Sequence, residues 1–96
     1  MIFDPTFSHL EGAMRAASAK QAVIAHNIAN ANTPGYEPLD FSEELNRAIK
    51  SADKKKVVIE EEMAALSDNS VRYSSYVKLL SQKINILRTI ATQGRR

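Results

Sequence analysis

Apolar residues recur in steps of three and four along the first third of the chain, which predicts an amphipathic helix from about Asp4 to Asn30. Asp4 followed by Pro5 is a typical helix start, because Asp accepts bonds from unpaired N–H groups and Pro suits the first helical position. The stripe is as narrow as a coiled-coil seam. Its seven positions, six of them apolar, are Phe7, Leu10, Met14, Ala17, Gln21, Ile24 and Ile28.

The last third repeats this pattern over a longer stretch and predicts a second helix, roughly Glu60 to Gln93, closed by Gly94. The three glutamates that open it and Arg95-Arg96 beyond its end suit the helix dipole, and we expect all three carboxylates to be solvated. Eight of its nine seam positions are apolar: Met63, Leu66, Ser70, Tyr73, Val77, Leu80, Ile84, Leu87 and Ala91.

The segment between the two helices begins with a strong turn signal. Thr33 precedes a proline and is held away from helical dihedrals, and Pro34-Gly35 suits a type II turn. Asp40 or Ser42 then favours a short helix through about Lys50. A polar loop over 51–56 follows, and residues 57–59 form an extended linker.

Together these elements predict an all-α fold: an elongated two-helix coiled coil with a short, partly helical middle segment. The divisions are 1–36, 37–59 and 60–96, acting as a single assembled domain. At about 1.5 Å per residue the helices are roughly 39 and 51 Å long. A compact domain of this size is only about 34 Å across, since its radius of gyration is near 13 Å. We therefore expect lateral association with neighbouring chains.

Charge divides the chain unevenly. The net charge is +2, and no acidic residue follows Asp68. Such a basic half favours an acidic partner, a membrane surface or nucleic acid. The basic residues after Asp68 scatter around the predicted helix rather than lining one edge, and no aromatic residues are interleaved for base stacking. We therefore expect no nucleic-acid partner.

Candidate chemistry is sparse. The chain has no cysteine, no phosphate-binding glycine loop and no Gly-x-Ser-x-Gly motif. His9 and His26 lie on one predicted helix but about 260° apart around its axis, so they do not converge on a metal. No apolar run approaches the roughly 20 residues of a membrane span, and charged residues interrupt the first twenty positions. We expect no enzyme activity, cofactor, metal, membrane span or cleaved signal peptide.

Asparagines cluster at the end of the first predicted helix. Asn27, Asn30 and Asn32 precede the turn at Thr33. One interpretation is a helix C-terminus, where amides satisfy unpaired carbonyls. The other is hydrogen bonding to a neighbouring subunit, because polar residues beside an apolar seam fix register. The residues alone leave both interpretations open.

The stretch 25–36 resembles the signature of the bacterial flagellar rod and hook proteins. The residues that match that signature are Asn27, Ala29, Asn30, Thr33, Pro34, Gly35 and Tyr36. The run 69–90 is similar to the B-type branch of the basal-body rod proteins. The resemblance implies a structural subunit of the proximal rod, located in the periplasm and exported by the flagellar type III apparatus. Implied partners are itself, other rod proteins, the rod-to-ring junction protein and the export gate.

Under this hypothesis the two seams are buried on assembly, since two helices leave much of each seam open. The C-terminal seam residues would pack against Phe7, Leu10, Met14, Ile24 and Ile28. Asn27 and Asn30 would fix register with a neighbour. An alternative function is an autonomous cytoplasmic helical-hairpin adaptor or secretion chaperone. A third, a basic nucleic-acid binder, predicts DNA binding that weakens steeply with salt.

Overall fold

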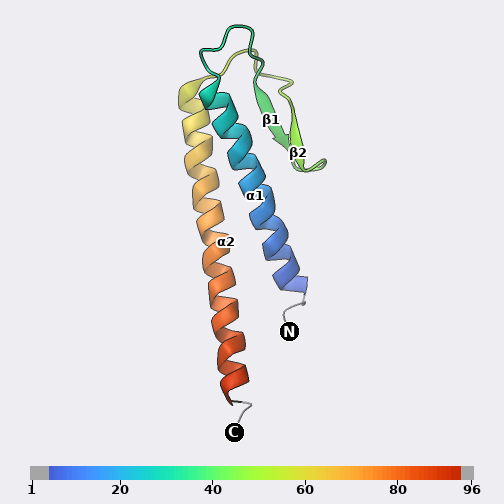
Figure 1. Ribbon diagram of the computed structural model, residues 1–96, viewed down its shortest axis with the longest axis vertical. Helices are drawn as coiled ribbons and strands as arrows, with labels where there is room; N and C mark the ends of the chain where they lie inside the picture. The colour runs from blue at the N-terminus through green and yellow to red at the C-terminus, as the bar shows by residue number, and fades with distance from the viewer. Residues whose placement is uncertain (1–4, 94–96) are drawn as a thin grey trace.

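A computed structural model describes residues 5–93 as a helical hairpin with a small β-hairpin beside it (Figure 1). Helix α1 spans Pro5–Ala29 and helix α2 spans Ile59–Gln93. The two helices run antiparallel, side by side. Strands β1 (Leu39–Ser42) and β2 (Arg47–Lys50) pair antiparallel and lie against α1. The predicted caps at Asp4 and Gly94 and the pair Arg95-Arg96 lie outside the described residues.

The molecule is elongated, as the sequence predicted. Its principal extents are 66 × 23 × 16 Å and its radius of gyration is 18.0 Å, against about 13 Å for a compact chain of this length. Its accessible surface is 7359 Å², whereas a compact monomer of this mass exposes about 5,500 Å². Among the described residues the buried hydrophobic side chains of the core are Ala17, Val23 and Ile24. The core is therefore thin.

The turn after α1 takes the predicted form. The Tyr36 N–H donates to the Thr33 carbonyl at 3.1 Å, and Gly35 has a φ of 77°. A positive φ at the third residue is the mark of a type II turn, which glycine adopts without steric cost. Pro34-Gly35 thus directs the chain out of the helix and towards the first strand.

The prediction of a short helix over residues 40–50 is wrong, because this segment is the β-hairpin. Leu39 pairs with Lys50 and Ser42 with Arg47, around a four-residue turn in which Asn46 takes a φ of 53°. Asn tolerates that left-handed conformation better than most residues. The Ser51 N–H donates to the Pro38 carbonyl at 3.0 Å and extends the pairing by one step. Residues 57 and 58 form the predicted linker without regular structure.

The face that α2 turns towards α1 is offset from its most apolar stripe. Leu66, Leu80 and Leu87 are partly buried, as expected for seam positions. The other predicted seam positions of α2 differ, because at each of them the preceding residue is less exposed than the seam residue itself. Positions 62, 69, 76 and 83 are buried or half-buried, whereas 63, 70, 77 and 84 are exposed. One residue rotates the helix face by about 100°, so part of the apolar stripe points away from α1.

Candidate assembly interface

A buried asparagine organises the end of the hairpin where the turn lies. The Asn27 side chain is only 1% exposed. Its Nδ2 donates to the Leu39 carbonyl at 2.8 Å, and its Oδ1 accepts the Leu39 N–H at 2.9 Å. The amide thus binds both backbone groups of one residue, as a neighbouring strand would. This pairing holds the start of β1 extended against α1.

Tyr36 completes the hydrogen bonding around this amide. Its hydroxyl donates to Asn27 Oδ1 at 2.6 Å and lies 2.8 Å from His26 Nδ1. Because the phenolic proton is directed to Asn27, the phenolic oxygen accepts from the His26 N–H. Burial raises the pKa of Tyr36, and the negative charge of Glu62 raises it further. The phenol therefore stays a proton donor at neutral pH.

Glu62 brings α2 into the same cluster, and the expectation that all three opening glutamates are solvated is wrong for it. Its side chain is 3% exposed. One carboxylate oxygen accepts from Asn27 Nδ2 at 3.4 Å, and the other lies 3.3 Å from Lys54 Nζ. Lys54 also lies 3.9 Å from Asp40. A buried carboxylate needs such partners, since its desolvation is otherwise costly. We call His26, Asn27, Tyr36, Leu39, Lys54 and Glu62 the Asn27 network.

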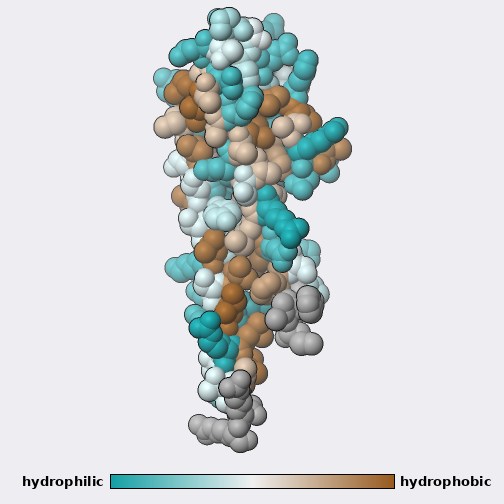
Figure 2. Space-filling view, viewed as in Figure 1, coloured by the Kyte–Doolittle hydropathy of each residue, from teal (hydrophilic) through white to brown (hydrophobic). Residues whose placement is uncertain are grey.

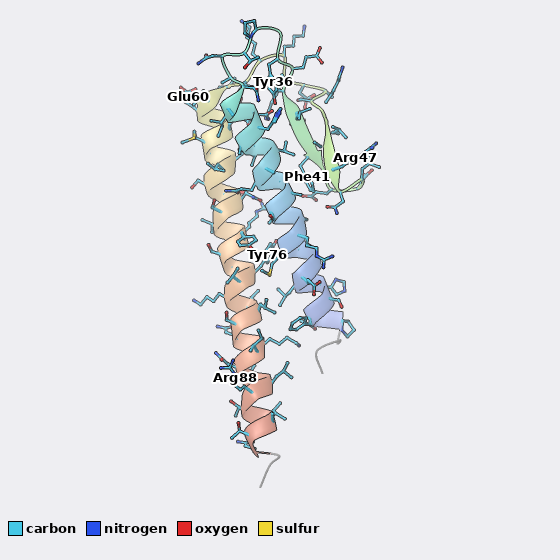
Figure 3. The ribbon with its side chains drawn as sticks, in the orientation of Figure 1. Tyr36, Phe41, Arg47, Glu60, Tyr76 and Arg88 are labelled. Carbon is cyan, nitrogen blue, oxygen red and sulfur yellow. The ribbon has the colours of Figure 1, made fainter. Side chains whose placement is uncertain are left out.

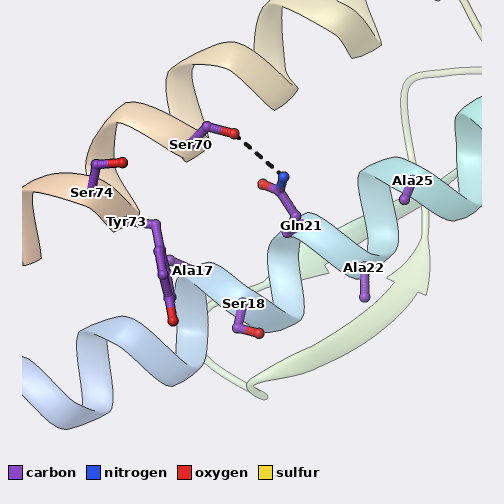
Figure 4. Close-up of a pocket in the computed structure, with 8 residues that line it drawn as sticks. All are labelled: Ala17, Ser18, Gln21, Ala22, Ala25, Ser70, Tyr73 and Ser74. Carbon is purple, nitrogen blue, oxygen red and sulfur yellow. Dashed lines mark hydrogen bonds between the residues drawn. The ribbon is translucent and has the colours of Figure 1, made fainter. Parts of the chain in front are cut away.

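A second polar layer joins the helices farther along the hairpin (Figure 4). Asn69 is buried, and its Nδ2 donates to the Ala17 carbonyl and to Gln21 Oε1, both at 2.8 Å. Gln21 Nε2 in turn donates to Ser70 Oγ at 3.3 Å. Gln21 and Ser70 are the two polar interruptions of the predicted seams. They meet across the hairpin and set the register of α1 against α2.

A shallow groove of about 530 Å³ opens beside this layer, between the two helices. Most of its lining side chains are small. The lining residues are Ala17, Ser18, Gln21, Ala22, Ala25, Ser70, Tyr73 and Ser74. Short side chains leave the helix backbones accessible, so another helix can approach closely here.

The predicted seam residues differ in how far the hairpin itself covers them. Ile24 is buried. Those half-buried are Phe7, Leu10, Met14, Ile28, Leu66, Leu80 and Leu87. Those exposed are Met63, Tyr73, Val77 and Ile84. As a result, hydrophobic atoms reach the surface along the two helices, whereas the end of the hairpin that carries the turn is mostly hydrophilic (Figure 2). One helical hairpin leaves both seams incomplete.

The motif residues near the turn bond within the chain. Asn30 Nδ2 donates to the His26 carbonyl at 2.9 Å, and Thr33 Oγ1 donates to Asn30 Oδ1 at 3.2 Å. The helix C-terminus interpretation therefore holds for Asn30. Asn27 is too deeply buried to reach a neighbouring subunit, so the expectation that it fixes register with one is wrong. Ala29 and Pro34 are exposed.

Three contributors to the two polar layers escaped prediction: Lys54 and Glu62 at the turn end, and Asn69 farther along the hairpin. A usable signal existed, since Gln21 and Asn27 lie on or beside the inward stripe of α1 and buried polar groups require partners. Polar residues on the facing helix were the available candidates. In the described part of the chain, no group of three or more acidic or histidine side chains is arranged to hold a metal ion. Within residues 5–93, neither helix is apolar enough over its length to cross a bilayer.

Comparison with known proteins gives two concordant results. A family model described as flagella basal body rod protein matches residues 7–36, which cover most of α1 and the turn. The flagellar basal body rod protein FlgB of Bacillus subtilis (strain 168) is 28% identical over 127 aligned positions, covering 98% of each chain. FlgB of Buchnera aphidicola is 40% identical over 45 residues, covering 45% of this chain and 34% of the relative.

Proposed function

Because this chain is a flagellar basal body rod protein resembling the FlgB type, we propose that it builds the proximal rod through the exposed faces of its two helices. The protein is a structural subunit. The observation that supports this mode of assembly is the contrast between satisfied polar layers and uncovered apolar stripes on one hairpin. Met63, Val77 and Ile84 carry an apolar surface that only a neighbouring subunit covers.

The thin core supports a fold that is completed on assembly. Burying one Leu or Ile side chain contributes about 1.5–3 kcal/mol, and the hairpin buries few large apolar side chains completely. Residues 1–36, 37–59 and 60–96 then act as one assembled domain rather than as independent units. A weakly stable monomer also suits export in the unfolded state by the flagellar type III apparatus.

The proposal also names partners and location. The chain assembles with itself and with other rod proteins in the periplasmic part of the basal body, next to the rod-to-ring junction protein and above the export gate. The protein acts by packing and not by catalysis. The alternative of an autonomous adaptor or secretion chaperone is not favoured, since both relatives are rod proteins.

Two valines about 120° apart around the axis of α2 test the mode of assembly. Val77 lies on the uncovered seam, whereas Val71 lies outside it; both are exposed. Val77→Asp places a charge in the contact with a neighbour, so we expect loss of rods from basal bodies isolated from cells lacking the wild-type gene. Val71→Asp is the matched control and is expected to retain them. Normal rods with Val77→Asp would overturn the proposed packing.

Leu80→Asp is a more severe version of the same test. Leu80 is half-buried and lines a hollow between the helices together with Phe7 and Met14. A carboxylate there disturbs both the hairpin and the assembly, so we expect assembly to be abolished. Wild-type polymerisation by this variant would contradict the assignment of Leu80 to a packing seam.

A further inference from the structure

The hydrogen bonds of the β-hairpin show which backbone groups of its strands point outward. The Ser51 N–H donates to the Pro38 carbonyl, so these two residues form a hydrogen-bonded pair. Opposite residues in an antiparallel ladder alternate between bonded and non-bonded pairs, and the next pair, Leu39 with Lys50, is therefore non-bonded. The backbone groups of both residues point out of the hairpin, and those of Leu39 reach the Asn27 side chain. The register and the Asn27 contacts therefore agree.

The same alternation leaves β2 with free backbone groups on its outer side. Ala48 lies two residues from Lys50 and pairs with Phe41, so its N–H and C=O also point out of the hairpin. No hydrogen bond within residues 5–93 reaches these outward groups of β2. All four residues of β2 are exposed, and β2 lies on the side of β1 away from α1 (Figure 1). The β1 edge thus faces α1, whereas the β2 edge is open.

Charge divides between the two halves of the hairpin segment. Residues 37–46 carry four acidic side chains and no basic one, whereas residues 47–56 carry five basic side chains and one acidic one. Arg47 lies at the free end of the hairpin, away from both helices (Figure 3), and forms no ion pair within the described chain. Lys50 lies 3.1 Å from Glu37, but both side chains are exposed, so this pair contributes little. The open edge is therefore bordered by basic side chains.

We propose that the outer edge of β2 binds an extended, acidic segment of another protein, which adds a third strand to the hairpin. The main-chain groups of Ala48 and Lys50 supply the hydrogen bonds of such a strand addition. On its inner side β2 already pairs with an acidic strand, in which Asp40 lies opposite Ile49. An antiparallel partner of similar character places acidic residues opposite Lys50 and Arg47. It also places an apolar residue opposite Ile49, which is 37% exposed.

A second copy of this chain fits the same edge poorly. Two β2 strands paired antiparallel, edge to edge, bring basic side chains directly or diagonally opposite each other, which destabilises the pair. The acidic β1 of a second copy is not available, because its outer edge faces α1 and Leu39 is already bonded to Asn27. The contact also lies apart from the helix faces on which the proposed function depends, and it goes beyond that function.

Peptide binding to the purified, isotope-labelled full-length chain tests the proposal by NMR. The probe is acetyl-TEVTET-amide, which carries the acidic and apolar residues at the required spacing, and acetyl-TKVTKT-amide is its control. With the acidic probe we expect the amide protons of Ala48 and Lys50 to shift downfield and to exchange about tenfold more slowly. The amide protons of Arg47 and Ile49 point towards β1 and are expected to keep their shifts.

Three outcomes of this titration would overturn the proposal. Unchanged Ala48 and Lys50 amides would show that the edge is a short, charged strand that resists pairing. Equal binding of the two peptides would remove the charge complementarity. Slow exchange of the Ala48 and Lys50 amides that rises with protein concentration, without peptide, would show that a second copy occupies the edge.

Variants of β2 separate strand addition from binding elsewhere. Ala48→Pro removes an outward N–H that β1 does not use, a position at which edge strands tolerate proline, and is expected to abolish binding. Ala48→Thr keeps the N–H and is the matched control, expected to bind as the wild type does. The Ile49 amide shift reports whether the hairpin is intact, and binding by Ala48→Pro with an intact hairpin would contradict the proposal.

A charge variant keeps the test decisive if proline disturbs the hairpin. Arg47→Glu changes an exposed side chain outside the ion pairs of the described chain. The variant is expected to bind the basic peptide more tightly than the acidic one, the reverse of the wild-type preference. An unchanged preference for the acidic peptide would show that the peptide lies elsewhere on the protein.

Discussion

The two ends of this hairpin differ in how far the chain pairs and covers its own side chains. We call the end at Pro34-Gly35 the turn end and the far part of α2, beyond Leu80, the shaft end. At the turn end, Asn27, Tyr36 and Glu62 place their polar groups in hydrogen bonds and ion pairs within the chain. Farther along α2, the side chains of Val77 and Ile86 are exposed to solvent. The same pair of helices pairs its buried polar groups at the turn end and leaves hydrophobic side chains exposed along its length. Under the proposed function a thin core is expected, because neighbouring subunits complete it on assembly.

The largest expected loss of stability comes from removing the Asn27 side chain, at the centre of the turn end. Asn27→Ala leaves the Leu39 N–H, the Leu39 carbonyl and the Tyr36 hydroxyl without their partner. Since each buried polar group left unpaired costs about 1–3 kcal/mol, we expect a loss of about 3–5 kcal/mol. Urea denaturation followed by circular dichroism measures it. The control Asn32→Ala changes an exposed residue and should stay within about 0.5 kcal/mol of wild type.

Glu62→Gln tests the charge of the same cluster while keeping its shape. The substitution removes the ion pair with Lys54. We expect a loss of about 2 kcal/mol, below the 3–5 of a fully buried pair, because Lys54 still reaches solvent. Glu61→Gln, one residue earlier and exposed, is the control and should change stability by less than about 0.5 kcal/mol. Equal effects would show that burial of Glu62 does not matter.

Substitution of two glycines by alanine is expected to change the stability of the chain in opposite directions. Gly35 has a φ of 77° in the turn, and no atom crowds the position of its missing Cβ. Gly35→Ala should therefore cost about 1–2 kcal/mol from backbone conformation alone. Gly12 lies in α1 with open space around it, so Gly12→Ala should stabilise by about 0.5–1 kcal/mol. Thermal melts of both variants check the signs, and two shifts in the same direction would contradict the argument.

Tyr36→Phe is expected to have only a small effect on stability at neutral pH, about 1 kcal/mol from the lost bond to Asn27. Its pH dependence is more specific. Burial and then Glu62 raise the pKa of Tyr36 above its ordinary 10.0. An acid whose pKa is raised on folding stabilises fully below the unfolded value and less as pH rises through the folded value. Wild type should therefore lose more stability than Tyr36→Phe above about pH 10. Parallel losses would contradict the raised pKa.

The elements that depend on local sequence could be predicted, whereas those that depend on distant partners could not. Both helices follow from their apolar periodicity, and the type II turn follows from Pro34-Gly35. The β-hairpin was mistaken for a helix because its strands are only four residues long. What holds β1 extended is the side chain of Asn27, twelve residues earlier.

The same limit explains the orientation of α2. Its most apolar stripe runs through Met63, Val77 and Ile84, so hydrophobicity alone selects that stripe. The hairpin instead turns Glu62 and Asn69 inward, where Asn27 and Gln21 meet them. Polar pairing across the hairpin decides the rotation, and one sequence pattern does not reveal which polar residues will meet. The role of the exposed stripe in assembly stays a prediction.

Under the proposed function, the turn end is formed in the free chain and the shaft end is formed by neighbours. Amide hydrogen exchange on the purified full-length chain at low concentration tests it most directly, since exchange reports local opening segment by segment. We expect protection around Asn27, Leu39 and Asn69, and near-absent protection in α2 beyond Leu80. Protection in that last stretch should appear when the protein is assembled. Equal protection along the whole of α2 in the free chain would show that the shaft end forms without neighbours.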